Sequence, residues 1–135
     1  MEIDVRGPRF GAALTTLVLA VVLITGSGWL LAVQAAFFAV GAAAGVQNSP
    51  YGRLFRGVVR PRIGPPPATE DAAPPRFAQA VGLVFSVVGV IGYAVGPQWL
   101  GLAATACALA AAFLNAAFAY CLGCEMYLLL KRATA

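Results

Sequence analysis

The chain has 135 residues, of which 61% are apolar and 10% are charged, and its formal net charge at pH 7 is +4. Soluble domains carry about 25% charged residues, and a folded chain of this size leaves about a third of its surface exposed. Nine basic and five acidic side chains are too few to cover such a surface. The composition excludes an ordinary soluble enzyme, a disordered chain and a disulfide-rich secreted scaffold, and it predicts an integral membrane protein.

Four apolar runs approach the length of about 20 residues that a helix needs to cross a bilayer. They cover approximately residues 10–26, 29–46, 77–96 and 98–120. The Gly-rich breaks within each pair are short, which is typical of antiparallel neighbours. We therefore predict a single transmembrane domain, residues 1–135, of the all-α class, with four transmembrane helices arranged as two helical hairpins. A signal peptide is the alternative for the first run, but Glu2 and Asp4 and the lack of a cleavage site argue against it.

The basic residues predict how this bundle is oriented. They lie in the N-terminal segment, in the loop 47–76 and in the C-terminal segment, and the two hairpin turns carry no charge. Positively charged segments stay in the cytosol. We expect a multi-pass protein of the bacterial plasma membrane whose two termini and loop 47–76 are cytoplasmic.

The loop is expected to hold a short amphipathic helix. Ser49 can cap a helix that begins at Pro50, and Pro61 is expected to end it. One face of the helix is apolar and is expected to enter the inner leaflet. The other face and the adjoining turn carry the predicted anion- and lipid-binding residues Arg53, Arg56, Arg60 and Arg62. Anionic lipid headgroups, at about 1 kcal/mol per arginine, are the predicted ligand, and a collecting surface for an oxyanion or a partner is the alternative.

Small residues recur in the apolar runs at the spacing that allows helices to approach closely. The predicted helix-packing residues are Gly41, Gly45, Gly82, Gly89 and Gly92. Packing within one bundle is the simpler interpretation, and a homo-oligomer is the alternative. The runs hold no mid-membrane charge and the chain has no histidine, which argues against an ion channel and against His-based catalysis. We expect no cofactor, no metal and no nucleic-acid partner.

Cys121 and Cys124 form the pattern with the clearest chemical meaning. Their spacing serves a dithiol/disulfide couple or half of a four-cysteine metal site. Cys107 lies fourteen residues earlier, about 20 Å along a helix, so a closed zinc site would need a second subunit. A permanent disulfide is not expected in the reducing cytosol. Two packed cysteines are the alternative, and Cys107 is expected to be a packing residue.

The reactivity of this pair depends on the local helix. If one helix continues to Leu130, the thiols lie near its negative end and Glu125 adds negative charge, which disfavours the thiolate. If Gly123 breaks the helix, a new N-terminus near Cys124 favours the thiolate. Both arrangements remain open. Cys121, Cys124 and Glu125 are the candidate catalytic residues.

Four stretches of the sequence together form a recognisable set of motifs: residues 49–56, 60–66, 70–79 and 115–127. With these motifs the chain resembles the domain of unknown function 4395 family, small membrane proteins common in actinobacteria. The resemblance covers nearly the whole chain, and Cys-Leu-Gly-Cys-Glu is its most specific part. The family has no established activity, but its members often lie beside thioredoxin-like and rhodanese-like genes. This neighbourhood implies thiol or sulfane-sulfur handling.

Two classes of function follow. In the first, the cysteine pair exchanges electrons or a persulfide with a soluble thioredoxin- or rhodanese-like partner, and the arginine-bearing helix gathers that partner or an oxyanion. In the second, the protein is a non-catalytic accessory subunit of a larger membrane complex. A small sulfur-compound transporter acting as an oligomer is a further alternative.

Overall fold

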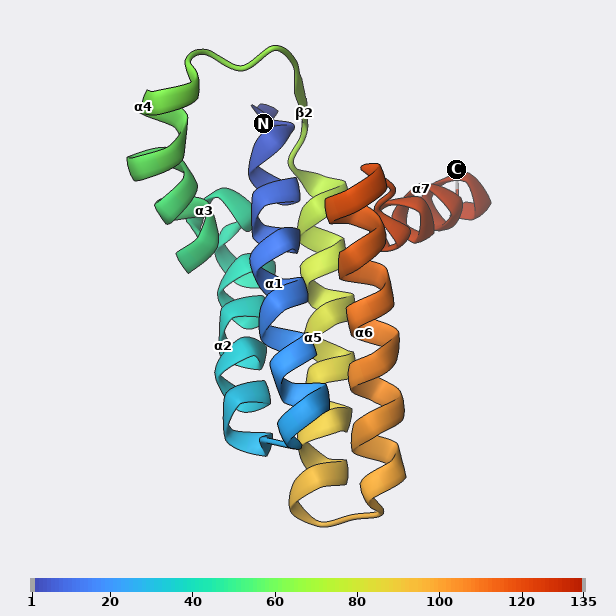
Figure 1. The fold of residues 1–135 in the computed structure, drawn as a ribbon. Helices are drawn as coiled ribbons and strands as arrows, with labels where there is room; N and C mark the ends of the chain where they lie inside the picture. The colour runs from blue at the N-terminus through green and yellow to red at the C-terminus, as the bar shows by residue number, and fades with distance from the viewer. Residues whose placement is uncertain (1, 135) are drawn as a thin grey trace.

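The computed structural model describes residues 2–134, and its main body is a bundle of four helices (Figure 1). These helices are α1 (Arg6–Thr25), α2 (Gly28–Ala44), α5 (Ala73–Ala94) and α6 (Gln98–Phe118). The most extensive packing joins α2 to α5, α1 to α6 and α5 to α6. Both ends of the chain and the segment between α2 and α5 lie at one end of the bundle, and the two short turns lie at the other (Figure 1).

The bundle has the lengths and the surface of a membrane protein. Helices α1, α5 and α6 are long and apolar enough to cross a membrane, and α2 is a shorter apolar helix of 17 residues. Large apolar side chains cover the outside near the two turns, where Ile24, Trp29 and Val95 are each more than four-fifths exposed. Exposing such an apolar surface to water would cost free energy, whereas lipid chains can cover it. The chain is therefore a helical protein with three to four helices that could span a membrane.

Glycines mark the places where the bundle helices approach closely. A Cβ added at Gly82 would lie 2.7 Å from the Phe38 ring, and one added at Gly89 would lie 2.6 Å from Leu31. Likewise, Gly41 faces Gln79 and Gly92 faces the backbone of Gly101. Gly45 differs from these four, because it ends α2 with a φ of 98° and lies outside the helix. Its part is a change of chain direction and not the helix packing predicted for it.

A small two-stranded sheet, not foreseen in an all-α prediction, covers the end of the bundle. Strand β1 (Glu2–Asp4) pairs antiparallel with β2 (Thr69–Asp71), so that Ile3 lies opposite Glu70. The strands also share a side-chain hydrogen bond, which Thr69 Oγ1 donates to Glu2 Oε1 over 3.1 Å. This pairing ties the N-terminal segment to the chain that leads into α5.

Between α2 and β2 the chain forms one continuous helical arm, which we call the arginine arm. It comprises α3 (Pro50–Leu54), a π-helical turn η2 (Phe55–Val59) and α4 (Arg60–Ile63), after a 3₁₀ turn η1 (Val46–Asn48). Ser49 caps α3 as predicted, since its Oγ accepts the Gly52 N–H at 3.1 Å. The prediction that Pro61 ends the helix is wrong, because the arm continues to Ile63. A proline clashes with the carbonyl four residues earlier in a regular α-helix, and the wider π turn before Pro61 changes that geometry.

The last helix, α7 (Leu122–Thr134), does not continue α6. It lies across the end of the bundle and points away from it (Figure 1). It packs mainly on α5 and less on α6.

Candidate functional site

The chain turns sharply where α6 ends. Ala119 adopts the left-handed conformation with a φ of 56°, and its N–H donates to the Asn115 carbonyl over 3.1 Å. Such a residue is a common way to end a helix, although glycine or asparagine usually fills it. The break therefore precedes Cys121 and does not occur at Gly123. Of the two arrangements left open by the sequence, the structure has the one with a new helix N-terminus at the cysteines.

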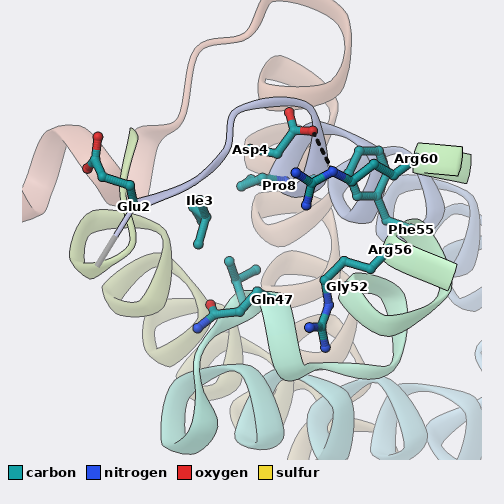
Figure 2. A pocket seen from close by; sticks show the side chains of 11 residues that line it. Glu2, Ile3, Asp4, Pro8, Gln47, Gly52, Phe55, Arg56 and Arg60 are labelled. Carbon is teal, nitrogen blue, oxygen red and sulfur yellow. Dashed lines mark ion pairs between the residues drawn. The ribbon is translucent and has the colours of Figure 1, made fainter. Parts of the chain in front are cut away.

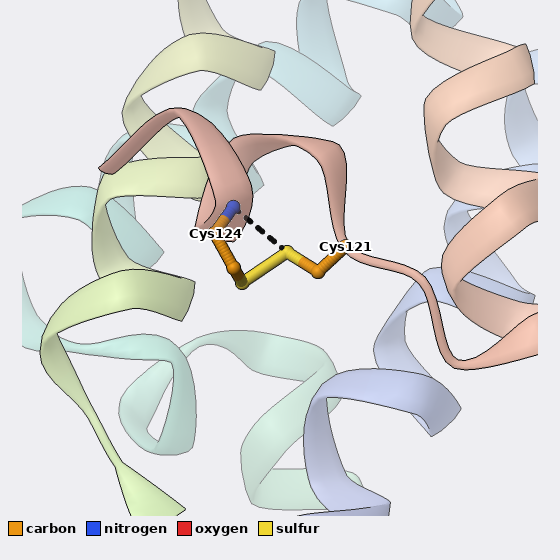
Figure 3. Close-up of a disulfide and its surroundings, with 2 residues drawn as sticks. All are labelled: Cys121 and Cys124. Atoms are coloured by element: carbon orange, nitrogen blue, oxygen red, sulfur yellow. Dashed lines mark hydrogen bonds between the residues drawn. A yellow bond between two sulfur atoms is a disulfide. The ribbon is translucent and has the colours of Figure 1, made fainter. Parts of the chain in front are cut away.

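Cys121 and Cys124 are bonded to each other as a disulfide (Figure 3). Cys121 immediately precedes α7 and Cys124 lies in its first turn, so their Cα atoms are 5.1 Å apart. This separation is within the usual range for a disulfide. The Cys124 N–H also donates to Cys121 Sγ over 3.1 Å. The same N–H group could therefore donate a hydrogen bond to the sulfur of Cys121 after the disulfide is reduced.

The helix N-terminus sets the electrostatics of the pair. Unpaired N–H groups make the start of α7 positive, which favours a thiolate at Cys121 over a thiol once the pair is reduced. Glu125 lies in the same first turn with its side chain exposed. Within residues 2–134 this carboxylate has no side-chain hydrogen bond or ion pair, so no contact yet supports the catalytic role predicted for it.

Gly123, where the sequence allowed a helix break, has a packing role instead. A Cβ at Gly123 would lie 2.5 Å from the Cβ of Ala78, so only glycine lets α7 rest on α5 at this point. One turn further along, the Tyr127 ring packs at 5.8 Å from the Phe77 ring. These two contacts place the disulfide against the bundle.

The disulfide forms part of the wall of a cavity of about 720 Å³, which we call the thiol cavity. It extends between α1, α5 and α6 and under the start of α7. Its apolar wall contains small residues of α5 and α6, among them Gly82, Ala108, Ala111 and Ala112. Its polar lining residues are Arg9, Thr15, Glu70, Gln79 and Asn115. Cys107, which was expected to be a packing residue, also lines this cavity and is exposed, so no buried contact among the described residues supports that role.

The arginine arm lies at the same end of the molecule but belongs to a different cavity, of about 220 Å³ (Figure 2). Arg56 and Arg60 line this second cavity, and none of the four predicted anion-binding arginines lines the thiol cavity. The structure therefore does not bring these arginines to the cysteines.

Some of the arginines of the arginine arm have partners within the protein. Asp4 accepts hydrogen bonds from Arg6 and lies 4.0 Å from Arg60 (Figure 2), and the Arg6 hydrogen bond lowers the pKa of Asp4. Arg56 donates to Asn48 over 3.3 Å, whereas Arg53 and Arg62 are exposed. The apolar face of the arm is also partly buried against the protein and partly exposed.

Phe55 is only 3% exposed and packs on Phe10, with ring centroids 5.7 Å apart, while Leu54 and Val58 are each 45% exposed. The prediction that the whole apolar face enters the leaflet is thus wrong for Phe55, because its ring fills a gap against α1.

Sequence reasoning missed the polar lining of the thiol cavity. No role was predicted for Glu70 from the sequence, but it lines this cavity, and burial, reinforced by the nearby charge of Glu2, raises its pKa. Gln79 and Asn115 lie within the apolar runs, and no role was predicted for either of them from the sequence. Their positions in the family motifs could have indicated a functional role. Glu70 and Gln79 are the first and last residues of the stretch 70–79, and Asn115 is the first residue of the stretch 115–127.

In a comparison with protein-family models, residues 3–132 match a domain of unknown function (DUF4395). The chain belongs to this family. The match confirms the resemblance drawn from the four motifs, and it includes all three cysteines of this DUF4395 chain. Comparison with curated proteins and with solved structures gives no match. The function of this DUF4395 protein must therefore be argued from its site.

Proposed function

We propose that this DUF4395 protein is a thiol–disulfide exchange component of the bacterial plasma membrane, with Cys121 and Cys124 as its working pair. The observation that carries the proposal is the disulfide at the N-terminus of α7 (Figure 3). Cysteine pairs at helix N-termini are reactive because the thiolate, which is the nucleophile, is favoured there. The site also sits at an end of the bundle, where a soluble partner can reach it.

The partner we propose is a thioredoxin- or rhodanese-like protein. With a dithiol partner, the partner's thiolate attacks the disulfide, a mixed disulfide forms, and a second partner thiol then displaces it. The partner is oxidised to a disulfide and the pair is reduced to two thiols. With a persulfide partner, a reduced cysteine of the pair takes the terminal sulfur atom and the partner leaves as a thiolate.

The proposed topology has α1, α2, α5 and α6 as four spans, with the arginine arm, α7 and both termini in the cytosol. Two observations support it: four apolar helices lie side by side, and every basic residue lies at or beyond the end of the bundle that carries the chain termini (Figure 1). A reporter fused after residue 135 tests this orientation. Cytosolic reporter activity is expected, and periplasmic alkaline phosphatase activity would contradict it.

The reduction potential of the pair tests the proposed activity. In detergent or nanodiscs, the wild type is expected to equilibrate with thioredoxin at about −200 to −300 mV, the range of cytosolic dithiol couples. Cys121→Ser and Cys124→Ser should each abolish exchange, whereas Cys107→Ser should not change it. A pair that neither exchanges with a dithiol nor accepts a persulfide would favour the accessory-subunit or transporter alternatives.

A further inference from the structure

We propose that the thiol cavity binds a lipid-soluble quinone, which oxidises the reduced Cys121–Cys124 pair. The inference rests on the proposed function and names the second reactant of the same site. It also addresses why a disulfide would persist at a cytosolic face: the pair would be reoxidised from the membrane side.

The size and lining of the cavity fit a flat ring ligand. Its volume of about 720 Å³ lies within the range of about 300–1,000 Å³ that is usual for small-molecule sites. Alanines and a glycine on α5 and α6 leave a wall with few side-chain atoms, against which a ring can lie.

Polar groups are placed in this apolar cavity where ring oxygens could be bound. Thr15 of α1 is 5% exposed and lines the cavity, and its hydroxyl has no hydrogen-bond partner within residues 2–134. Gln79 of α5 and Asn115 of α6 line it as well, and their side-chain amides are also free of hydrogen bonds in this part of the chain. A quinone has two carbonyl oxygens that accept hydrogen bonds, whereas an acyl chain has none to offer these donors.

The cavity reaches the outer surface of the bundle. Among its lining residues, Phe85 of α5 and Cys107 and Ala110 of α6 are exposed. In the proposed topology these residues face acyl chains, so a ligand dissolved in the bilayer can enter between α5 and α6, below α7. The lining on α6 runs from Cys107 to Asn115, about 12 Å along the helix axis, which gives room for part of an isoprenoid tail as well as the ring.

The reaction balances with these two reactants. The reduced pair loses two S–H bonds and gains one S–S bond, which releases two electrons and two protons. The quinone takes both, and its two carbonyls become the hydroxyls of a hydroquinone. A soluble dithiol then reduces the pair again by the exchange described above.

Two charged groups that line the cavity suit the proton and charge movements of this reaction. Arg9 lines the cavity and is held by a hydrogen bond that it donates to the Ala116 carbonyl over 3.0 Å. It brings a positive charge to the cavity that the cysteine pair also lines. Glu70 lines the same cavity, and its carboxyl, whose pKa burial raises, is a group through which a proton can pass.

Single-turnover oxidation with decylubiquinone tests the inference. The full chain in nanodiscs is reduced, freed of reductant without oxygen, and mixed with the quinone. We expect saturable kinetics and one quinone reduced for each disulfide formed, measured by quinone absorbance and by protection of the cysteines from maleimide. Cys121→Ser/Cys124→Ser should still bind decylubiquinone saturably in calorimetry but should not reduce it.

Two matched alanines on α6 locate the site. Ala110 lines the cavity and Ala106, one turn away, does not, although both are exposed and so tolerate a larger side chain. Ala110→Phe should slow oxidation by about tenfold or more, because overpacking a cavity opposes its ligand. Ala106→Phe should leave the rate unchanged, and equal rates for the two variants would overturn the assignment.

The outcomes separate this inference from the proposed function. If decylubiquinone does not bind saturably, or if phospholipid displaces it and no disulfide forms, the cavity is an acyl-chain site and the inference fails. Thioredoxin exchange can still succeed in that case, so the proposed function stands. If the quinone oxidises the pair but no soluble dithiol reduces it, the quinone site stands and the proposed partner is wrong.

Discussion

The arginine arm and α7 both follow a bundle helix and lie at the same end of the molecule, yet they are attached in different ways (Figure 1). The arm is anchored by buried contacts: Phe55 packs on Phe10, and Tyr51 donates to the buried amide oxygen of Gln34 over 2.7 Å. The arm also approaches Asp4 through Arg60. Such buried polar and aromatic contacts make the arm part of the scaffold.

Helix α7 has no buried residue among Leu122–Thr134. No side chain of this helix makes a hydrogen bond or an ion pair with another helix within the described residues. Its attachment to α5 includes the Gly123–Ala78 contact and the Tyr127–Phe77 rings, and the short chain through Cys121 joins it to α6. Segments with few buried contacts open at low free energy. The cysteine pair therefore lies at the start of the more weakly attached of the two elements, which suits the exchange with a soluble partner that we propose.

Substituting one glycine in each element should give the largest difference between them. Gly123→Ala is expected to lower the free energy of unfolding by about 1–3 kcal/mol, because the added Cβ meets Ala78. Gly57→Ala is its matched control, since nothing lies within 4 Å of an added Cβ there, and it should be neutral or stabilising by up to about 1 kcal/mol. Denaturant unfolding and hydrogen exchange of α7 measure both. Equal effects would show that α7 does not depend on the glycine contact.

Removing a charge should weaken the arm and leave α7 unaffected. Asp4→Asn is expected to lower the free energy of unfolding by about 1–2 kcal/mol at pH 7, since its charged hydrogen bonds to Arg6 are lost. Glu125→Gln removes an exposed carboxylate that has no partner within the described residues, and it should change the free energy of unfolding by less than about 0.5 kcal/mol.

The pH dependence gives the Asp4 prediction a sign. In the folded protein the pKa of Asp4 lies below its ordinary value of 3.8. A carboxyl with a depressed pKa stabilises the fold above its unfolded pKa and loses that contribution as the pH falls through the folded one. The difference between wild type and Asp4→Asn should therefore be constant near neutral pH and shrink below 3.8. A difference that grows in acid would contradict this origin.

The smallest effect on stability is expected from the two arginines of the arm that make no hydrogen bond or ion pair within residues 2–134. Arg53→Gln/Arg62→Gln should leave stability unchanged but weaken the preference for anionic over zwitterionic nanodiscs by about 1 kcal/mol per arginine. Lys131→Gln/Arg132→Gln makes the same change of charge on α7. Lipid preference measured in both variants shows which element contacts the headgroups, and no change in the first would leave Arg53 and Arg62 with a role in orientation alone.

Much of the scaffold could be predicted because it depends on local properties. Apolar run lengths predicted the bundle helices, and Gly26 ends α1 where the pattern placed the first turn. Ser49 followed by Pro50 predicted the start of the arginine arm, because capping and proline geometry involve only neighbouring residues. The cysteine motif and the family were also recognised from the sequence, since spacing and residue type carry that information.

The sequence by itself determined the class of the protein, its helices, its charge distribution and the presence of a closely spaced cysteine pair, all of which follow from composition and short-range order. Only the tertiary structure decided where the last helix breaks, because Ala119 is by propensity a helix former and its left-handed conformation reflects the packing of α7 on α5. It likewise decided that Phe55 turns inward and that Gly123 serves close packing. The thiol cavity belongs to the same group, since its walls come from α1, α5, α6 and α7, and no local pattern reports which side chains from distant segments will face one another.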